Sequence, residues 1–260
     1  MKNLSLSQSL IKGFSIIELL SSSPALGVTN ISNQLQMNKS IVHRLLSTLV
    51  ALNYVEKDPI SRLYRLTTKL FEVGRTGSGF KDLEKATAPV MERLAREMGE
   101  TIALAILDKG ELVHIAKIES QQPLRADLPV GARLPPHCTA LGKVLLAQLS
   151  SHELEAIFEG LDIVKMTSKT ITDLDVFKKE LSSVRKLGYA VNDEEYAMGI
   201  RCIGVPVKGA DQEVLASLSV SGPSVRIQHK DIKRLSQILI SAAEEVTQKL
   251  IRKMSGSGIE

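Results

Sequence analysis

The sequence has few features of a secreted or membrane protein. Its only cysteines, Cys138 and Cys202, are too few for a disulfide framework, so we expect two reduced thiols. No apolar run reaches the roughly 20 residues that a membrane-spanning helix needs. The N-terminal segment lacks both a continuous apolar core and a small-residue cleavage site, and its pattern predicts an amphipathic helix rather than a signal peptide. These absences favour a cytoplasmic globular protein that does not contact a membrane.

The sequence also lacks the usual marks of an enzyme or a metalloprotein. It has no glycine-rich phosphate loop, and no motif surrounds Cys202 and His137, the pair that could supply a nucleophile and a base. Four residues could be imagined as metal ligands, but their spacing matches no standard zinc pattern: His114, His137, Cys138 and Cys202. We therefore expect no catalysis and no cofactor, and we keep an enzyme and a bound metal ion as alternatives.

Positive charge is concentrated near the N-terminus. The net charge of the 260 residues is +4. Residues 1–80 hold nine Lys and Arg against four Asp and Glu, whereas residues 81–260 hold 24 against 25. This asymmetry is expected when one of two domains meets phosphate and the other does not, although a solvated basic face gives the same count. The length also suggests two modest domains.

The most informative segment is residues 29–55, where a tight polar break joins two short helical patterns. The second pattern opens at Asn38, a favoured N-cap residue. An aliphatic stripe then recurs at helical spacing, at Ile41, Leu45, Leu46, Leu49 and Leu52. A helix with one aliphatic face and a polar N-terminal half suits a DNA major groove. The candidate DNA contacts are Asn38, Lys39, Ser40, His43, Arg44 and Ser47. Arg44 could instead stabilise the domain by pairing with Glu56 or another acid.

The flanking segments complete a winged helix-turn-helix domain over residues 1–66. A helix is predicted over 9–21, with Leu10, Phe14, Ile17 and Leu20 on one side. Two alternating runs, 54–57 and 62–66, flank a polar turn and predict a β-hairpin. Three cations lie at or near this wing, within reach of a DNA backbone: Lys57, Arg62 and Arg65. Residues 67–80 contain three glycines and predict a linker, with a short helix that ends near Gly74.

Residues 81–260 predict a second domain with an antiparallel sheet flanked by helices. A helical pattern from about 82 ends at Gly99. Two hairpins are predicted, 100–108 with 111–119 and 202–209 with 214–222. Helices are predicted at 139–149 and 151–158, from 172 to Gly188, and from about 229 to 251. The fold class is therefore α+β.

The chain resembles the IclR-type bacterial transcriptional regulators over nearly its whole length. The matching blocks occur in the family's order, at residues 39–58, 99–107, 124–149, 184–207 and 218–227. The resemblance implies a winged helix-turn-helix domain, a linker helix and a GAF-like α/β effector-binding domain. It also implies homodimers, often paired into homotetramers, on palindromic operators in double-stranded DNA.

An effector site is predicted after Pro135-Pro136, which stops the preceding strand. Thr139 can cap the next helix, leaving the N–H groups of Ala140, Leu141 and Gly142 free to bind a small carboxylate. The resemblance adds Asn192, where a relative has Asp, together with Cys202, Ser219 and Ser221. The two serines are two apart on a strand and share one side. They could instead face solvent, and Cys202 could be a packing residue.

These observations predict a sequence-specific DNA-binding regulator, which we expect to be a repressor. A small organic acid bound in the C-terminal domain would modulate operator binding. The alternative is a DNA-binding protein whose C-terminal domain only oligomerises. The effector, the target genes and the choice between dimer and tetramer stay open.

Overall fold

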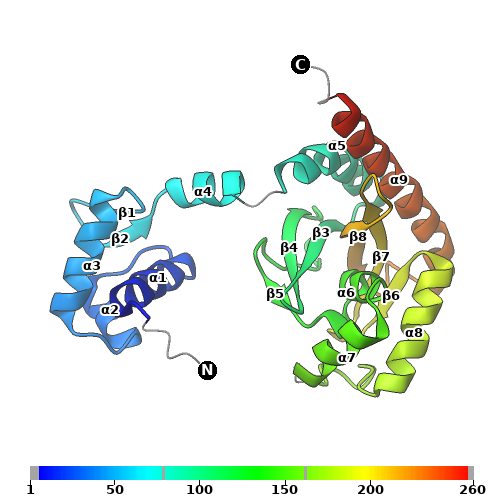
Figure 1. The fold of residues 1–260 in the computed structure, drawn as a ribbon, viewed down its shortest axis with the longest axis horizontal. Coiled ribbons are helices and arrows are strands. Elements are labelled where there is room, and N and C mark those ends of the chain that lie inside the picture. Colours follow the sequence, from blue (N-terminus) through cyan, green and yellow to red (C-terminus); the bar gives the residue numbers. More distant parts are fainter. Residues whose placement is uncertain (1–5, 78–79, 161–162, 257–260) are drawn as a thin grey trace. The chain divides into compact units, whose positions relative to one another are not determined.

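The computed structural model describes residues 6–77, 80–160 and 163–256 (Figure 1). The chain divides into two compact units, Met1–Lys81 and Asp82–Glu260, and each is described separately. Residues 78 and 79 of the predicted linker lie outside the described residues.

The first unit contains three helices, a two-stranded hairpin and a fourth helix. These elements are α1 (Gln8–Ser21), α2 (Val28–Gln34), α3 (Lys39–Ala51), β1 (Val55–Lys57), β2 (Tyr64–Leu66) and α4 (Lys69–Gly77). The hairpin is antiparallel and pairs Val55 with Leu66. Its turn is closed by Asp58, whose Oδ1 accepts hydrogen bonds from the Ile60 and Ser61 amides. The predicted winged helix-turn-helix is therefore confirmed, while α4 continues beyond Gly74.

The apolar residues of α1 and α3 do not all face the core of this unit. Ile16 and Leu20 of α1 pack with Val42 and Leu46 of α3. Three residues of the predicted apolar stripes are exposed: Leu10 by 59%, Phe14 by 57% and Leu52 by 50%. The apolar stripes predicted from the sequence are therefore directed only in part at the core of this unit. Both helices are apolar on a second side, which the unit leaves uncovered.

The second unit is a six-stranded antiparallel sheet with helices on both sides. Its helices are α5 (Lys81–Met98), α6 (Ala140–Leu146), α7 (Ser151–Gly160), α8 (Leu174–Leu187) and α9 (Ile232–Gly256), with short 3-10 turns η1 (Pro136–Cys138) and η2 (His229–Asp231). Its strands are β3 (Thr101–Asp108), β4 (Glu111–Ile118), β5 (Arg133–Leu134), β6 (Ala190–Asp193), β7 (Ile200–Lys208) and β8 (Val214–Pro223). The strand order is β5-β4-β3-β8-β7-β6. Both predicted hairpins and the mixed helix and strand content are confirmed.

Glycines fix the boundaries of several elements. Gly99 ends α5 with a φ of 69°, and Gly188 ends α8 with a φ of 75°, both in the left-handed region that side chains disfavour. The tight turn between β3 and β4 uses Lys109 and Gly110, also with positive φ. These ends were predicted because the residue type itself limits the backbone.

The register of the sheet places small and polar side chains on one face. Cys202 lies opposite Asn192 on one side and Ser221 on the other, and Gly204 lies opposite Ser219. Since side chains alternate, these residues share a face, and α6 covers it. A Cβ at Gly204 would lie 2.9 Å from the Ala140 carbonyl, so the helix rests directly on the strand. We call this surface the α6 face; α9 packs against β7 and β8 from the opposite side (Figure 1).

Candidate functional site

The polar residues of α3 form an exposed surface at the start of the helix. Ser40, His43, Arg44 and Ser47 are all exposed, as predicted from their positions off the aliphatic stripe. Asn38 is the N-cap residue, but its side chain makes no capping hydrogen bond. The first amide groups of α3 are thus uncapped by Asn38, and a helix N-terminus of this kind suits a phosphate oxygen.

The wing carries cations in three different environments. Arg65 Nε donates to Glu56 Oε1 at 2.5 Å, and Lys57 Nζ lies 5.3 Å from the centre of the Tyr64 ring. Arg62 is exposed at the turn, with a φ of 62°. Because Glu56 pairs with Arg65, the alternative pairing of Arg44 with Glu56 is not observed.

An apolar groove lies between the second sides of α1, α3 and α4. Its volume is about 620 Å3. The apolar residues that line it are Leu10, Phe14, Ile17, Leu45, Leu49, Leu52, Tyr54, Leu70 and Val73. Arg44 also lines the groove, so this side chain stands between the groove and the exposed surface of α3. We call this feature the α1–α3–α4 groove.

The start of α6 differs in one respect from the predicted anion site. Thr139 caps the helix as expected, because its Oγ1 accepts a hydrogen bond from the Gly142 amide at 3.0 Å. The expectation that Gly142 has a free N–H group is therefore wrong. Ala140 and Leu141 are buried against Gly204. With only seven residues in α6, the helix terminus alone is a weak basis for an anion site.

The structure brings the side chains of Asn192 and Cys202 together. The thiols of Cys138 and Cys202 are not activated as nucleophiles. Asn192 Nδ2 lies 3.9 Å from Cys202 Sγ, and Asn192 Oδ1 accepts from the Glu195 amide at 2.7 Å. Burial raises the pKa of Cys202 to about 11 and that of Cys138 to about 12. Burial also lowers the pKa of His137, whose Nε2 lies 3.1 Å from the Val164 carbonyl oxygen. A nucleophilic cysteine needs the opposite shift.

Four buried polar atoms have no hydrogen-bond partner among the described residues. They are His114 Nδ1, Arg125 Nε, Glu195 Oε2 and Ser219 Oγ, and all belong to the second unit. Such atoms are rare in folded proteins, and a bound water or ligand is one way in which they obtain a partner. Sequence reasoning found Ser219, considered His114 only as a metal ligand, and missed Arg125 and Glu195.

Two of these atoms can be placed on the α6 face from the sheet register, and the backbone next to Arg125 contacts β3 of the same sheet. Ser219 lies opposite Gly204, and His114 pairs with Ala105, which pairs with Ser217 of the same face. Arg125 precedes Ala126, whose carbonyl accepts a hydrogen bond from Thr101 Oγ1 at 3.0 Å. Thr101 pairs with Ser221. The loop that carries Arg125 therefore contacts β3 at the start of that strand.

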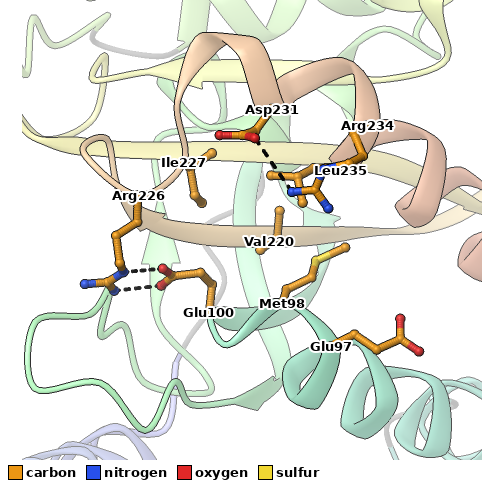
Figure 2. A pocket seen from close by; sticks show the side chains of 9 residues that line it. All are labelled: Glu97, Met98, Glu100, Val220, Arg226, Ile227, Asp231, Arg234 and Leu235. Atoms are coloured by element: carbon orange, nitrogen blue, oxygen red, sulfur yellow. Dashed lines mark hydrogen bonds and ion pairs between the residues drawn. The ribbon is translucent and has the colours of Figure 1, made fainter.

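A pocket of about 280 Å3 at the end of α5 has a different character (Figure 2). Glu100 accepts two hydrogen bonds from the Arg226 guanidinium, and Arg226 Nη2 also donates to the Leu124 carbonyl at 2.7 Å. Arg234 pairs with Asp231 at 3.7 Å. These charged groups are already paired with one another, so their ion pairs stabilise the walls of the pocket and are not available to a charged ligand.

The described part of the chain has neither a metal cluster nor a membrane-spanning helix. No group of three or more His, Cys, Asp or Glu residues there could hold a metal ion. No helix of residues 6–77, 80–160 and 163–256 is long and apolar enough to span a membrane.

Comparison with known proteins relates both units to one family. Residues 9–59 match the IclR helix-turn-helix domain, and residues 79–248 match the bacterial transcriptional regulator IclR C-terminal family. The HTH-type transcriptional regulator KdgR of Escherichia coli K12 is 36% identical over 93% of this chain and 92% of its own length. The transcriptional repressor IclR of the same organism is 30% identical over 92% of this chain and 89% of its own length. The Thermotoga maritima IclR structure superposes with a TM-score of 0.81 at 29% identity, covering 94% of this chain and 98% of that one.

Proposed function

Because the chain belongs to the IclR family of bacterial transcriptional regulators, we propose specific roles for its residues in DNA and effector binding. The chain is a DNA-binding transcriptional regulator of the helix-turn-helix type. We assign residues 1–66 to the DNA-binding domain, 67–80 to a linker, and 81–260 to effector binding and oligomerisation. Its relatives are regulators, which favours a protein without catalytic activity.

The operator is read by α3 and steadied by the wing. Ser40, His43, Arg44 and Ser47 are exposed on one side of α3, where side chains can reach base edges in the major groove. Arg44 is the residue best suited to guanine, because a guanidinium pairs with O6 and N7 together. The remaining candidates contact the phosphate backbone: Asn38 and Lys39 at the helix start, and Lys57, Arg62 and Arg65 on the wing.

Self-association is supported by the α1–α3–α4 groove. Leu10, Phe14 and Leu52 are each at least half exposed, and isolated domains rarely leave such a contiguous apolar surface uncovered. A second copy of the first unit would cover it and present two recognition helices. Half-sites would then lie about one helical turn, or a multiple of it, apart on a palindromic operator.

One observation supports effector binding: the hydroxyl of Ser219 has no hydrogen-bond partner in the part of the chain that the structure describes. This side chain is fully buried on the α6 face, in register with Gly204 and beside the row formed by Asn192, Cys202 and Ser221. Ala140 and Leu141 cover the same face. Arg125, whose Nη2 pairs with Glu119 at 3.4 Å, has a buried Nε–H donor without a partner among the described residues, and a donor on a cation suits a carboxylate. A small organic acid is therefore the proposed effector.

Effector binding would change operator affinity by thermodynamic coupling, typically about 1–3 kcal/mol. We propose that the protein represses transcription, which the named repressor among its relatives supports. A C-terminal domain that only oligomerises is the alternative. That alternative does not explain why the Ser219 hydroxyl is fully buried without a hydrogen-bond partner among the described residues.

Footprinting on the DNA upstream of the protein's own gene tests these roles, with and without a panel of organic acids. Arg44→Ala is expected to weaken specific binding much more than non-specific binding, whereas Lys57→Ala weakens both and lowers the salt slope by about one. If Arg44→Ala behaves like Lys57→Ala, Arg44 contacts phosphate. The double change Ser219→Ala and Ser221→Ala should abolish the effector response and leave operator affinity intact; an unchanged response places the effector elsewhere.

A further inference from the structure

A buried lysine beside the effector site has all of its donors in use. Lys143 is only 1% exposed. Its Nζ donates to Glu195 Oε1 at 2.6 Å, to Glu180 Oε1 at 3.1 Å and to the Val191 carbonyl oxygen at 3.1 Å. An ammonium group has three N–H donors. Lys143 therefore has no donor left for the second carboxylate oxygen of Glu195.

That second oxygen, Glu195 Oε2, is a buried acceptor without a partner among the described residues. The residue is 6% exposed, and its backbone is held at both ends. Its amide donates to Asn192 Oδ1 at 2.7 Å, and its carbonyl accepts from Thr170 Oγ1 at 2.7 Å. The loop thus fixes the carboxylate in a place where an unbonded charged acceptor is unfavourable.

Glu195 lies next to residues already assigned to the effector site. Asn192 contacts both Glu195 and Cys202. Burial raises the pKa of Cys138, just before α6, and of Cys202 on β7, and the negative charge of Glu195 raises both pKa values further. The carboxylate therefore stands within electrostatic range of the start of α6 and of the sheet below it. Burial also raises the pKa of Glu195 itself, because the charged carboxylate loses its hydration, although Lys143 and a backbone hydrogen bond of Asp193 oppose this shift.

We propose that Glu195 Oε2 accepts a hydrogen bond from a hydroxyl group of the effector, so that the protein selects hydroxylated organic acids. This inference rests on the effector site proposed above. An ionised carboxylate can only accept, so it disfavours an oxo group or a second carboxylate of the ligand at this position. An ammonium group would bring three donors to one free acceptor, with the cation of Lys143 close behind it. A hydroxyl group brings the single donor that the site lacks.

Glu195→Gln separates this role from a purely structural one. Lys143 needs an acceptor, so the amide oxygen of the glutamine is expected to face Nζ. The amide NH2 group then occupies the position of Oε2 and turns the free acceptor into a donor. The preference of the site should therefore reverse from hydroxy acids to oxo acids. Glu180→Gln is the matched control, because it also neutralises a carboxylate on Nζ but leaves Glu195 Oε2 unchanged.

The experiment uses the full chain and sets of acids that differ in one group. The probes are 2-hydroxy, 2-oxo and unsubstituted acids of two, three and four carbons, with gluconate against hexanoate as a longer pair. Affinity is measured by isothermal titration and by release of the footprinted operator. The wild type is expected to bind a hydroxy acid at least about tenfold more tightly than its oxo and unsubstituted analogues. Glu180→Gln keeps that order, and Glu195→Gln favours the oxo acid.

The outcomes distinguish this inference from the function on which it rests. If wild type binds acids but ranks oxo or unsubstituted acids equal to hydroxy acids, the role of Glu195 is refuted and the effector site stands. If no acid of the series binds, both are overturned. An unchanged preference in Glu195→Gln also refutes the inference. Should that variant fail to fold by circular dichroism, the wild-type ranking alone decides.

Discussion

Replacing Lys143 by methionine should destabilise the second unit in a way that depends on pH. The substitution keeps the apolar stem but removes the ammonium group from Glu195, which is 6% exposed. Removing one partner of a buried ion pair typically costs about 3–5 kcal/mol, because the other charge stays buried. Protonation of Glu195 sets a limit on that cost. From the ordinary pKa of 4.5, neutralising the carboxyl at pH 7 costs about 3.4 kcal/mol at about 1.4 kcal/mol per unit.

The sign of the pH dependence follows from the direction of the pKa shift. Burial raises the pKa of Glu195 in the folded protein, and loss of Lys143 raises it further. Between the unfolded and the folded pKa, the folded state binds more protons, so stability falls as pH rises. The loss in Lys143→Met is therefore expected to be about 3 kcal/mol at pH 7 and to shrink by about 1.4 kcal/mol per unit towards pH 5.

Urea denaturation of the full chain, followed by far-UV circular dichroism at pH 5, 6, 7 and 8, measures this loss. Lys143→Met combined with Glu195→Gln should recover most of the stability at pH 7, because no charge is then buried unpaired. Glu180→Gln, which changes a partly exposed partner of the same Nζ, should cost less than about 1 kcal/mol. An equal loss at pH 5 and pH 7, or no recovery in the double variant, would refute the reasoning.

Three further results are expected. Gly142→Ala should lower the free energy of unfolding by about 1–3 kcal/mol in thermal unfolding, because its Cβ would lie 2.2 Å from the Pro136 carbonyl oxygen. Gly13→Ala is the control, because a Cβ there meets nothing within 4 Å, and it should stabilise α1 by about 0.5–1 kcal/mol. Equal effects of the two substitutions would contradict this reasoning. Phe14→Asp should weaken self-association in sedimentation experiments, whereas Val225→Asp, which changes an even more exposed apolar residue outside the groove, should not. Burial lowers the pKa of His114 to about 4, so its NMR titration should have its midpoint there, and stability should rise with pH between about 4 and 6.5; a midpoint near 6.5 would show an exposed ring.

The elements that could be predicted from the sequence are those set by local backbone chemistry. Gly99 and Gly188 end helices where only a left-handed residue fits, and Lys109-Gly110 closes a hairpin of two alternating strands. The alternation of side chains on β8 also predicted that Ser219 and Ser221 share a face. In each case the residue type or its spacing of two carries the information.

The partners of charged side chains could not be predicted in this way. Lys143 and Glu195 are 52 residues apart, and nothing in the spacing of either residue indicates that they meet. Their contact depends on the placement of α6 over β6 and β7, which is a property of the assembled sheet. Short strands such as β6 (Ala190–Asp193) were missed because four residues are too few to show an alternating pattern.

The two most informative features of the structure are interactions that the monomer leaves incomplete. Sequence analysis can tell that Leu10 and Phe14 are apolar and that Glu195 is acidic, but only a fold shows whether each has found a partner. In the first unit an apolar stripe lies uncovered, which needs another surface. Among the described residues of the second unit, a carboxylate oxygen and a hydroxyl are buried without hydrogen-bond partners, so they need a donor or an acceptor from outside the chain. The two units therefore need different partners. The exposed apolar stripe of the first unit would be covered by a protein surface, whereas the unbonded polar atoms of the second unit would be satisfied by a small polar molecule.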